Sequence, residues 1–250
     1  GWGRADESWH FLEALEELGG ETWFRLGDKD LATHLERTRR LRQGHTLSEI
    51  TTEFCLRLGI SAAVVPMSDD PVRTIVDSSE GALPFQRWFL KRRCEPTVRS
   101  LFFDGADEAA MSHGMQVGLH DPQLGAIVIC PSNPLVSVDP ILRLRGASEV
   151  IRACPAPVIA VSPIVRGQAL KGPAAKMMQE MGMPVSAGGV ARFYHERGLL
   201  DGFVLDRQDA ELAEDIESLG IPVMMTNTVM LTLDDRIELA REVLDFAAGL

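Results

Sequence analysis

Polar side chains able to hold an anion follow a short apolar run near the middle of the chain. Residues 126–130 (AIVIC) are apolar and mostly β-branched, and Pro-Ser-Asn-Pro at 131–134 follows at once. This pattern is typical of a buried strand that ends in a tight turn. In an open α/β sheet, ligands bind beyond the carboxyl ends of the strands, where loop amides and helix N-termini point at anions. Residues 131–140 therefore indicate a phosphate-binding loop, although an ordinary strand-to-helix loop explains them equally well.

Other small polar or charged side chains follow the remaining predicted strands, and they are Ser162, Arg166, Lys171, Asp206, Thr226 and Asn227. Hydroxyls and amides with two or three cations suit a nucleotide diphosphate. The sequence has no G-x-G-x-x-G fingerprint, no P-loop, no H-x-x-x-H pair and no G-x-S-x-G elbow. The remaining reaction type is group transfer from an activated diphosphate, in which the protein positions the phosphates and a metal neutralises their charge.

A second candidate for chemistry is the pair Asp69 and Asp70, which follows a predicted strand at 62–66. Two adjacent carboxylates at a strand end could bind a divalent metal or orient a hydroxyl. An Asp immediately before Pro71 is just as typical of a turn. Both interpretations stay open.

The elements that must position these residues fall into two regions. Residues 1–60 are expected to be mainly helical, with helices at 5–18, 28–43 and 46–58. Residues 61–250 are expected to form an α/β nucleotide-binding core that is continuous with them. Its first strands are predicted at 62–66, 72–77 and 98–103, followed by a helix at 107–119.

From residue 126 onward, predicted strands alternate with helices. The strands are 126–130, 157–161, 202–206 and 222–225, and the helices are 136–143, 147–153, 174–182, 187–197, 209–219 and 234–248. This alternation predicts a Rossmann-like α/β fold, with a mostly parallel sheet covered by helices on both faces. Right-handed crossovers then place the loops at 131, 162, 206 and 226 on one edge.

The composition limits which partners this protein can bind and in which cellular compartment it is expected. The net charge of −11 disfavours nucleic acid, so any phosphate must be neutralised locally. No apolar run approaches the roughly 18 residues of a membrane span, and no signal peptide is present. The four cysteines are far apart and form no C-x-x-C pair, which favours a reducing cytoplasm over a disulfide framework.

Short motifs also occur in a specific order along the whole chain. They are GWGR (1–4), DESW (6–9), WFxLGDxDLA (23–32), PMSDDxVRT (66–74), FQxWF (85–89), ICPSNP (129–134), VSPIV (161–165) and LKGPA (170–174). Each motif alone is weak. The ordered series resembles the 2-phospho-L-lactate transferase family of coenzyme F420 biosynthesis.

This resemblance implies a magnesium-dependent enzyme. It would move a 2-phospho-lactyl or phosphoenolpyruvyl group from a GDP-linked donor to the terminal ribityl hydroxyl of the deazaflavin Fo, and release GMP. On chemical grounds we assign the donor phosphates to Ser132, Asn133, Ser162 and Lys171, catalysis or metal binding to Asp69 and Asp70, and the acceptor to Trp2, Arg4 and Trp88.

The chain departs from the family pattern at its start. Family members begin with a strand and a Gly-rich turn, followed by acidic residues, before the GWGR segment. The resemblance therefore implies that the first family strand, part of the nucleotide cradle and the chief metal ligands lie upstream of residue 1, which puts the activity of this chain in question.

An alternative of a different class is a non-catalytic, nucleotide-sugar-binding regulator on a similar fold. It would keep the phosphate loop and lose the deazaflavin surface. The sequence also leaves open whether the transferred group is lactyl or enolpyruvyl. A homodimer is a common state for enzymes of this size.

Overall fold

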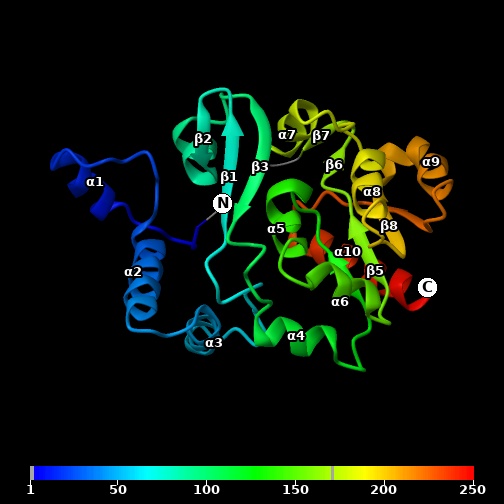
Figure 1. The fold of residues 1–250 in the computed structure, drawn as a ribbon, viewed down its shortest axis with the longest axis horizontal. Coiled ribbons are helices and arrows are strands. Elements are labelled where there is room, and N and C mark those ends of the chain that lie inside the picture. The colour runs from blue at the N-terminus through cyan, green and yellow to red at the C-terminus, as the bar shows by residue number, and fades with distance from the viewer. Residues whose placement is uncertain (1–2, 170–171) are drawn as a thin grey trace.

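The computed structural model describes residues 3–169 and 172–250, which form three parts in chain order (Figure 1). The first is a helical arm of α1 (His10–Glu17), α2 (Asp28–Arg42) and α3 (Leu47–Arg57). The second is an antiparallel sheet of β1 (Arg73–Ser78), β2 (Gly81–Pro84) and β3 (Val98–Asp104), in the order β2-β1-β3, with a π-helix, η1 (Arg87–Lys91). Helix α4 (His113–Leu119) leads from it to the third part.

The third part is a parallel sheet in the order β4-β5-β8-β9. Its strands are β4 (Ile127–Ile129), β5 (Val158–Val161), β8 (Gly202–Asp206) and β9 (Val223–Thr226). Because all three pairings are parallel, the segments that follow the four strands lie at the same edge of the sheet. The predicted Rossmann-like architecture is therefore confirmed.

Helices and a small hairpin lie between these strands, and α10 follows the last of them. They are η2 (Pro134–Val138), α5 (Asp139–Leu142), α6 (Ala147–Ala153), the hairpin β6 (Ile164–Val165) and β7 (Gln168–Ala169), α7 (Ala174–Glu180), α8 (Ala187–His195), η3 (Arg207–Leu212), α9 (Ala213–Glu217) and α10 (Leu233–Ala248). Among the described residues, no helix has the length and apolar character needed to cross a membrane.

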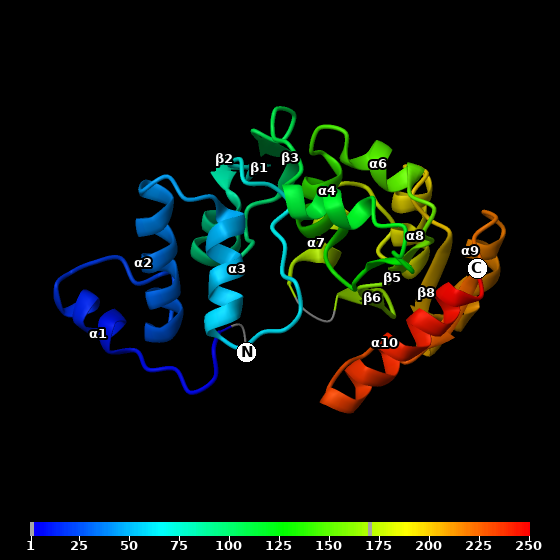
Figure 2. The ribbon, with the colours of Figure 1, turned by 90° about the horizontal axis from the view of Figure 1, so that it is seen from below.

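Alternation along the strands divides the core between the two faces of the parallel sheet. In β5, Val158 and Ala160 join the larger cluster with residues of α7 and α8, whereas Ile159 and Val161 join a smaller cluster with α10. Figure 2 shows α10 on the side of the sheet opposite α6 and α8. Both faces are buried, which explains why these strands read as continuous apolar runs.

The helical arm is held mainly by polar contacts, since α1 and α2 contain no buried residue. The carboxylate of Glu7 accepts hydrogen bonds from the amides of Lys29 (2.9 Å) and Asp30 (3.0 Å) in the first turn of α2. The carboxylate of Asp28 accepts hydrogen bonds from the first two amides of α1, at 3.1 and 3.2 Å. Each helix is thus capped by a side chain from the segment that carries the other helix.

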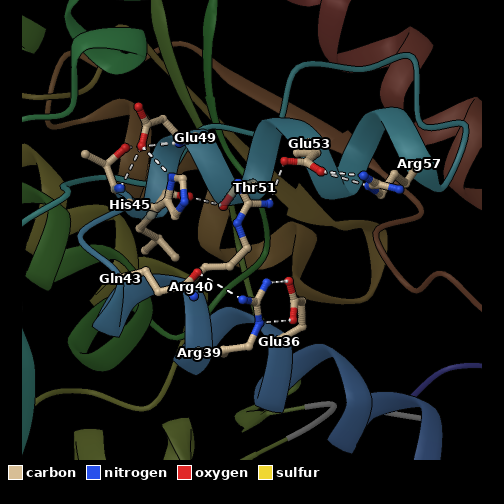
Figure 3. Close-up of polar contacts among 11 residues, drawn as sticks. Glu36, Arg39, Arg40, Gln43, His45, Glu49, Thr51, Glu53 and Arg57 are labelled. Atoms are coloured by element: carbon tan, nitrogen blue, oxygen red, sulfur yellow. Dashed lines mark hydrogen bonds and ion pairs between the residues drawn. The ribbon is translucent and has the colours of Figure 1, made fainter.

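An ion-pair network joins α2 to α3 (Figure 3). Glu53 on α3 accepts hydrogen bonds from Arg40 of α2 at 2.6 Å and from Arg57 at 2.9 Å. The Arg40 side chain is only 11% exposed, whereas that of Glu53 is 38% exposed, so only the arginine end of this pair is shielded from water. A capping box between Thr46 and Glu49 starts α3.

One predicted strand is wrong, and three observed strands were not predicted. The predicted strand at 62–66 is wrong: residues 61–65 are exposed and irregular, and the segment is held by hydrogen bonds from Ser112 to the carbonyls of Pro66 (2.6 Å) and Met67 (2.9 Å). Strand β2 and the hairpin β6–β7 were not predicted. Both are too short for alternation to be visible, because two to four residues carry no usable period.

Candidate active site

The Ser132-Asn133 turn lies beyond the end of β4, at the common edge of the parallel strands. The Asn133 side chain accepts a hydrogen bond from the amide of Leu135 at 2.9 Å and so caps η2. Its amide nitrogen lies 3.6 Å from the sulfur of Met177 in α7. Ser132 is half-buried, and its hydroxyl makes no hydrogen bond within the described residues. This turn therefore combines a fixed backbone with one hydroxyl that is open to a ligand.

The start of α7 lies beside this turn. Met177 is fully buried, and its amide donates to the carbonyl of Pro173 at 2.9 Å, so the contact with Asn133 fixes the first turns of α7. Helix α7, which follows the LKGPA motif, thus lies beside the turn of the ICPSNP motif. Lys171 lies outside the described residues.

Ser162 follows β5 at the same edge, but its hydroxyl is already used. It is 1% exposed, donates to the carbonyl of Ile164 at 2.8 Å and accepts from the amide of Ile164 at 3.1 Å. A hydroxyl turned back on its own loop has no donor left for a phosphate oxygen. The donor-phosphate role is therefore corrected: Ser162 shapes the turn that leads into β6.

Asp206 joins the loops that follow β8 and β9. One carboxylate oxygen accepts from the amide (3.0 Å) and side chain (3.1 Å) of Gln208, and the other accepts from the amide (2.8 Å) and hydroxyl (3.2 Å) of Thr228. Burial would raise the pKa of Asp206, but these hydrogen bonds outweigh it and lower the pKa below the ordinary Asp value. Asp206 is thus an ionised anchor that fixes two loops of the edge.

The remaining polar residues of the edge have different surroundings. Thr226 is buried and donates its hydroxyl to Glu242 of α10, whereas Asn227 is exposed. A cavity of about 590 Å³ opens beside η3, and its lining includes Arg166, Gln208 and Asp209. The edge therefore offers open polar groups near β4 and a hollow near β8.

Asp69 and Asp70 lie on the segment between the arm and the antiparallel sheet. Asp69 accepts a hydrogen bond from the amide of Ser48 at 2.7 Å, and Asp70 accepts one from the amide of Ala110 at 3.0 Å. Both residues are exposed, and the second oxygen of each carboxylate has no hydrogen bond among the described residues. The contacts of the pair fit a turn anchor and leave two oxygens for a further partner.

We tested whether this pair suits a magnesium ion. Within residues 3–169 and 172–250, no group of three or more His, Cys, Asp or Glu side chains could hold a metal by itself. Mg²⁺ is usually held by one or two carboxylates, with substrate phosphates and waters completing the octahedron. The open oxygens of Asp69 and Asp70 fit that donor set once a phosphorylated ligand is bound.

Comparison with known proteins identifies the family. A family model described as 2-phospho-L-lactate transferase CofD matches residues 7–239. The chain belongs to this family. A 2-phospho-L-lactate transferase from Methanococcoides burtonii is 36% identical over 249 residues, which cover 100% of this chain and 79% of that protein. A phosphoenolpyruvate transferase from Mycolicibacterium smegmatis is 35% identical over 237 residues, which cover 91% of this chain and 72% of that protein.

A solved structure shares the fold of this CofD-family chain. The crystal structure of protein BH3568 from Bacillus halodurans superposes with a TM-score of 0.57, over 88% of this chain and 72% of that one. At 14% identity the likeness concerns the fold alone.

Three residues of this CofD-family chain were predicted to contact a flat acceptor. Trp88 is fully buried, and its indole nitrogen donates to the carbonyl of Pro96 at 2.8 Å. Because no face of the ring is open for stacking, the acceptor role of Trp88 is corrected to a core role. Arg4 is exposed on the segment before α1, and Trp2 lies outside the described residues.

Sequence reasoning missed one residue at the edge of the CofD-family sheet. Asp209 is only 3% exposed, and both its carboxylate oxygens accept from the amide of Arg166, at 2.9 and 3.0 Å. The only signal in the sequence was its spacing, three residues after Asp206 in an otherwise helical pattern. The predicted helix at 209–219 places Asp209 at its first residue and gives no role to that spacing.

Proposed function

We propose that this chain transfers a 2-phospho-lactyl or phosphoenolpyruvyl group from a GDP-linked donor to the terminal ribityl hydroxyl of the deazaflavin Fo, in coenzyme F420 biosynthesis, and releases GMP. The observation that supports this most strongly is the family match over residues 7–239. Relatives named for each of the two groups are similar to this chain at 36% and 35% identity. Overall identity therefore does not select between lactyl and enolpyruvyl.

The donor phosphates would bind at the edge beyond β4. The open hydroxyl of Ser132, the capped turn at Asn133 and the cationic Lys171 supply donors of the kind that a pyrophosphate requires. The observed contact between Asn133 and Met177 supports this arrangement, because it brings the turn against the first turns of α7. A net charge of −11 makes such local neutralisation necessary.

Asp69 and Asp70 would act on the reacting groups. Their open oxygens would bind Mg²⁺ together with donor phosphates, or accept the proton of the attacking hydroxyl. Magnesium, when bound, would neutralise charge that develops on the phosphate oxygens. Trp2 and Arg4 would contact the acceptor.

In the reaction, the ribityl oxygen of Fo forms a bond to the phosphorus that bears the three-carbon acid. The bond between this phosphorus and the oxygen of GMP breaks, and GMP takes the electron pair. The hydroxyl proton leaves to a carboxylate or to water. Catalysis of this kind depends on positioning and charge neutralisation rather than on a covalent intermediate with the protein.

A coupled assay tests the proposal. The chain is mixed with Fo, Mg²⁺ and GDP-linked phospholactate or phosphoenolpyruvate, and the phosphodiester product and GMP are quantified by chromatography. One product molecule per GMP is expected with at least one donor. If neither donor yields product and Fo fluorescence does not change on addition of the protein, the transferase assignment fails and a nucleotide-binding regulator becomes the better account.

A further inference from the structure

We infer that Asp209 is a positioning residue: it fixes the turn between β6 and β7 and, through that hairpin, the first turns of α7, which β7 contacts. The inference rests on the proposed function, in which the segment that enters α7 binds the donor phosphates. Asp209 does not itself touch the donor in this scheme.

The turn needs an external support. In the hairpin, Ile164 pairs with Ala169 and Val165 pairs with Gln168, so Arg166 and Gly167 form a two-residue loop. Both have positive φ, 51° and 69°, as in the type I′ turns that match the twist of a hairpin. Glycine adopts this conformation easily, but for an arginine it costs free energy and persists only where the surroundings hold it.

Asp209 supplies that support from a different part of the chain. Its two oxygens lie 2.9 and 3.0 Å from the amide nitrogen of Arg166, across 43 positions in the sequence. A hairpin of two pairs has few hydrogen bonds of its own, and this contact is made to the strained residue itself. The carboxylate therefore ties the tip of the hairpin to η3.

The placement of Asp209 is itself unusual. Its φ of −112° and ψ of 25° interrupt the helical geometry of η3, which directs the side chain inward to 3% exposure. Burial raises the pKa of Asp209, the hydrogen bond from Arg166 opposes this, and the nearby charges of Glu211 and Asp206 raise it further. Burying a carboxylate near two others costs folding free energy. The hydrogen bond to the turn is a structural reason for an Asp at this position.

The hairpin leads directly to the proposed donor segment. Strand β7 ends at Ala169, and α7 begins at Ala174, so only four residues separate the anchored hairpin from the helix. Helix α7 contacts β7, and its buried Met177 lies beside Asn133. Loss of the Asp209 anchor is therefore expected to loosen the hairpin against which α7 lies.

Three variants separate positioning from general stability. Asp209→Ala removes the acceptor, whereas Asp209→Asn keeps an oxygen for the Arg166 amide and removes the charge. Glu211→Gln is the matched control, because Glu211 lines the same cavity, is exposed and makes no hydrogen bond among the described residues. Thermal unfolding of each variant first establishes that it folds.

Two readouts are then compared with wild type. Amide hydrogen exchange of 164–169 reports the anchoring, and calorimetric titration with GDP and Mg²⁺ reports the donor segment. We expect Asp209→Ala to accelerate exchange at the hairpin and to weaken GDP binding by about three- to tenfold, the effect of one lost hydrogen bond. Asp209→Asn and Glu211→Gln should resemble wild type in both measurements.

The two readouts also distinguish the possible failures. If amide exchange at 164–169 is unchanged in Asp209→Ala, Asp209 does not anchor the turn. If exchange is faster but GDP binding is unchanged, the turn does not influence the donor site. If the wild type itself does not bind GDP, the proposed function fails together with that link, and exchange alone still decides whether Asp209 holds the turn. If Asp209→Asn behaves like Asp209→Ala, the charge rather than the hydrogen bond is responsible and the positioning model is rejected.

Discussion

The carboxylate of Asp206 accepts two hydrogen bonds from Thr228, one from its amide at 2.8 Å and one from its hydroxyl at 3.2 Å. Asp206 ends β8, and Thr228 lies in the loop after β9, so the contact ties neighbouring strands together at their carboxyl ends. Both residues are buried, at 2% exposure each. The shape of this edge thus depends on one ionised side chain.

Loss of this anchor should be visible as a change in pH-dependent stability. Because the pKa of Asp206 is lowered in the folded protein, its contribution is present above the ordinary Asp pKa and is lost as pH falls through the folded pKa. Asp206→Ala leaves the Thr228 donors without a partner, and we expect a loss of about 1–3 kcal/mol in the free energy of unfolding at neutral pH. Urea unfolding of both proteins from pH 7 downward measures it. A deficit that stays constant across this range would contradict the assignment.

Asp70 allows its structural and chemical roles to be separated. Asp70→Asn keeps an oxygen for the Ala110 amide and removes the charge, whereas Asp70→Ala removes both. If the carboxylate binds magnesium or takes a proton, Asp70→Asn should lower kcat by about 100-fold or more with little change in melting temperature. Steady-state kinetics over a range of Mg²⁺ concentrations test this. Near wild-type turnover in Asp70→Asn would show that Asp70 only anchors its segment.

Trp88 should affect stability and not acceptor binding. It is fully buried, so Trp88→Ala is expected to lower the free energy of unfolding by about 3–5 kcal/mol. Trp88→Phe fills part of the space but leaves the Pro96 carbonyl without its donor, so a smaller loss is expected. Fluorescence titration with Fo provides the second measurement. An unchanged dissociation constant in folded Trp88→Phe is expected, and a large increase would restore a role in the acceptor site.

The ion pairs of the arm provide a comparison between shielded and exposed charges. Glu53→Gln removes the charge that pairs with Arg40, which is 11% exposed, and with Arg57, which is 74% exposed. Glu36→Gln removes the charge that pairs with Arg39, which is 54% exposed. We expect amide exchange in α2 and α3 to become about two- to fivefold faster in Glu53→Gln, which loses an ion pair between the two helices. Exchange in both helices should stay unchanged in Glu36→Gln, whose ion pair lies within α2. Added salt should reduce the difference between Glu53→Gln and wild type. Equal effects of the two substitutions would show that shielding is unimportant here.

The parallel core could be predicted from sequence because its signals are local. The bounds of α6 (Ala147–Ala153) and β8 (Gly202–Asp206) agree with prediction to the residue. Both are bordered by residues that interrupt regular structure, and β8 is buried on both faces, which produces an unbroken apolar run. The common edge of the strand ends then follows from the handedness of the crossovers.

Other features depend on partners that are distant in sequence. The pairing of β1 with β3 in a separate antiparallel sheet joins segments about twenty residues apart, and nothing in either strand specifies that partner. The motif residues Ser162 and Trp88 were assigned to ligands because of their chemistry. In the structure each is satisfied by a backbone carbonyl nearby, a choice that depends on side-chain direction and not on composition.

The reciprocal caps of α1 and α2 mean that the arm and the parallel sheet are stabilised by different interactions. Packing of apolar side chains stabilises the parallel sheet, whereas α1 and α2 are joined through the anionic side chains of Glu7 and Asp28. Hydrogen bonding, first from Ser8, lowers the pKa of Asp28, so its contacts with the first turn of α1 persist in mild acid and weaken as pH falls through that lowered pKa. Amide exchange below that pKa should therefore be faster in α1 and in the first turn of α2 than in the strands of the parallel sheet. In acid, this protein is therefore expected to unfold locally at α1 before the parallel sheet unfolds.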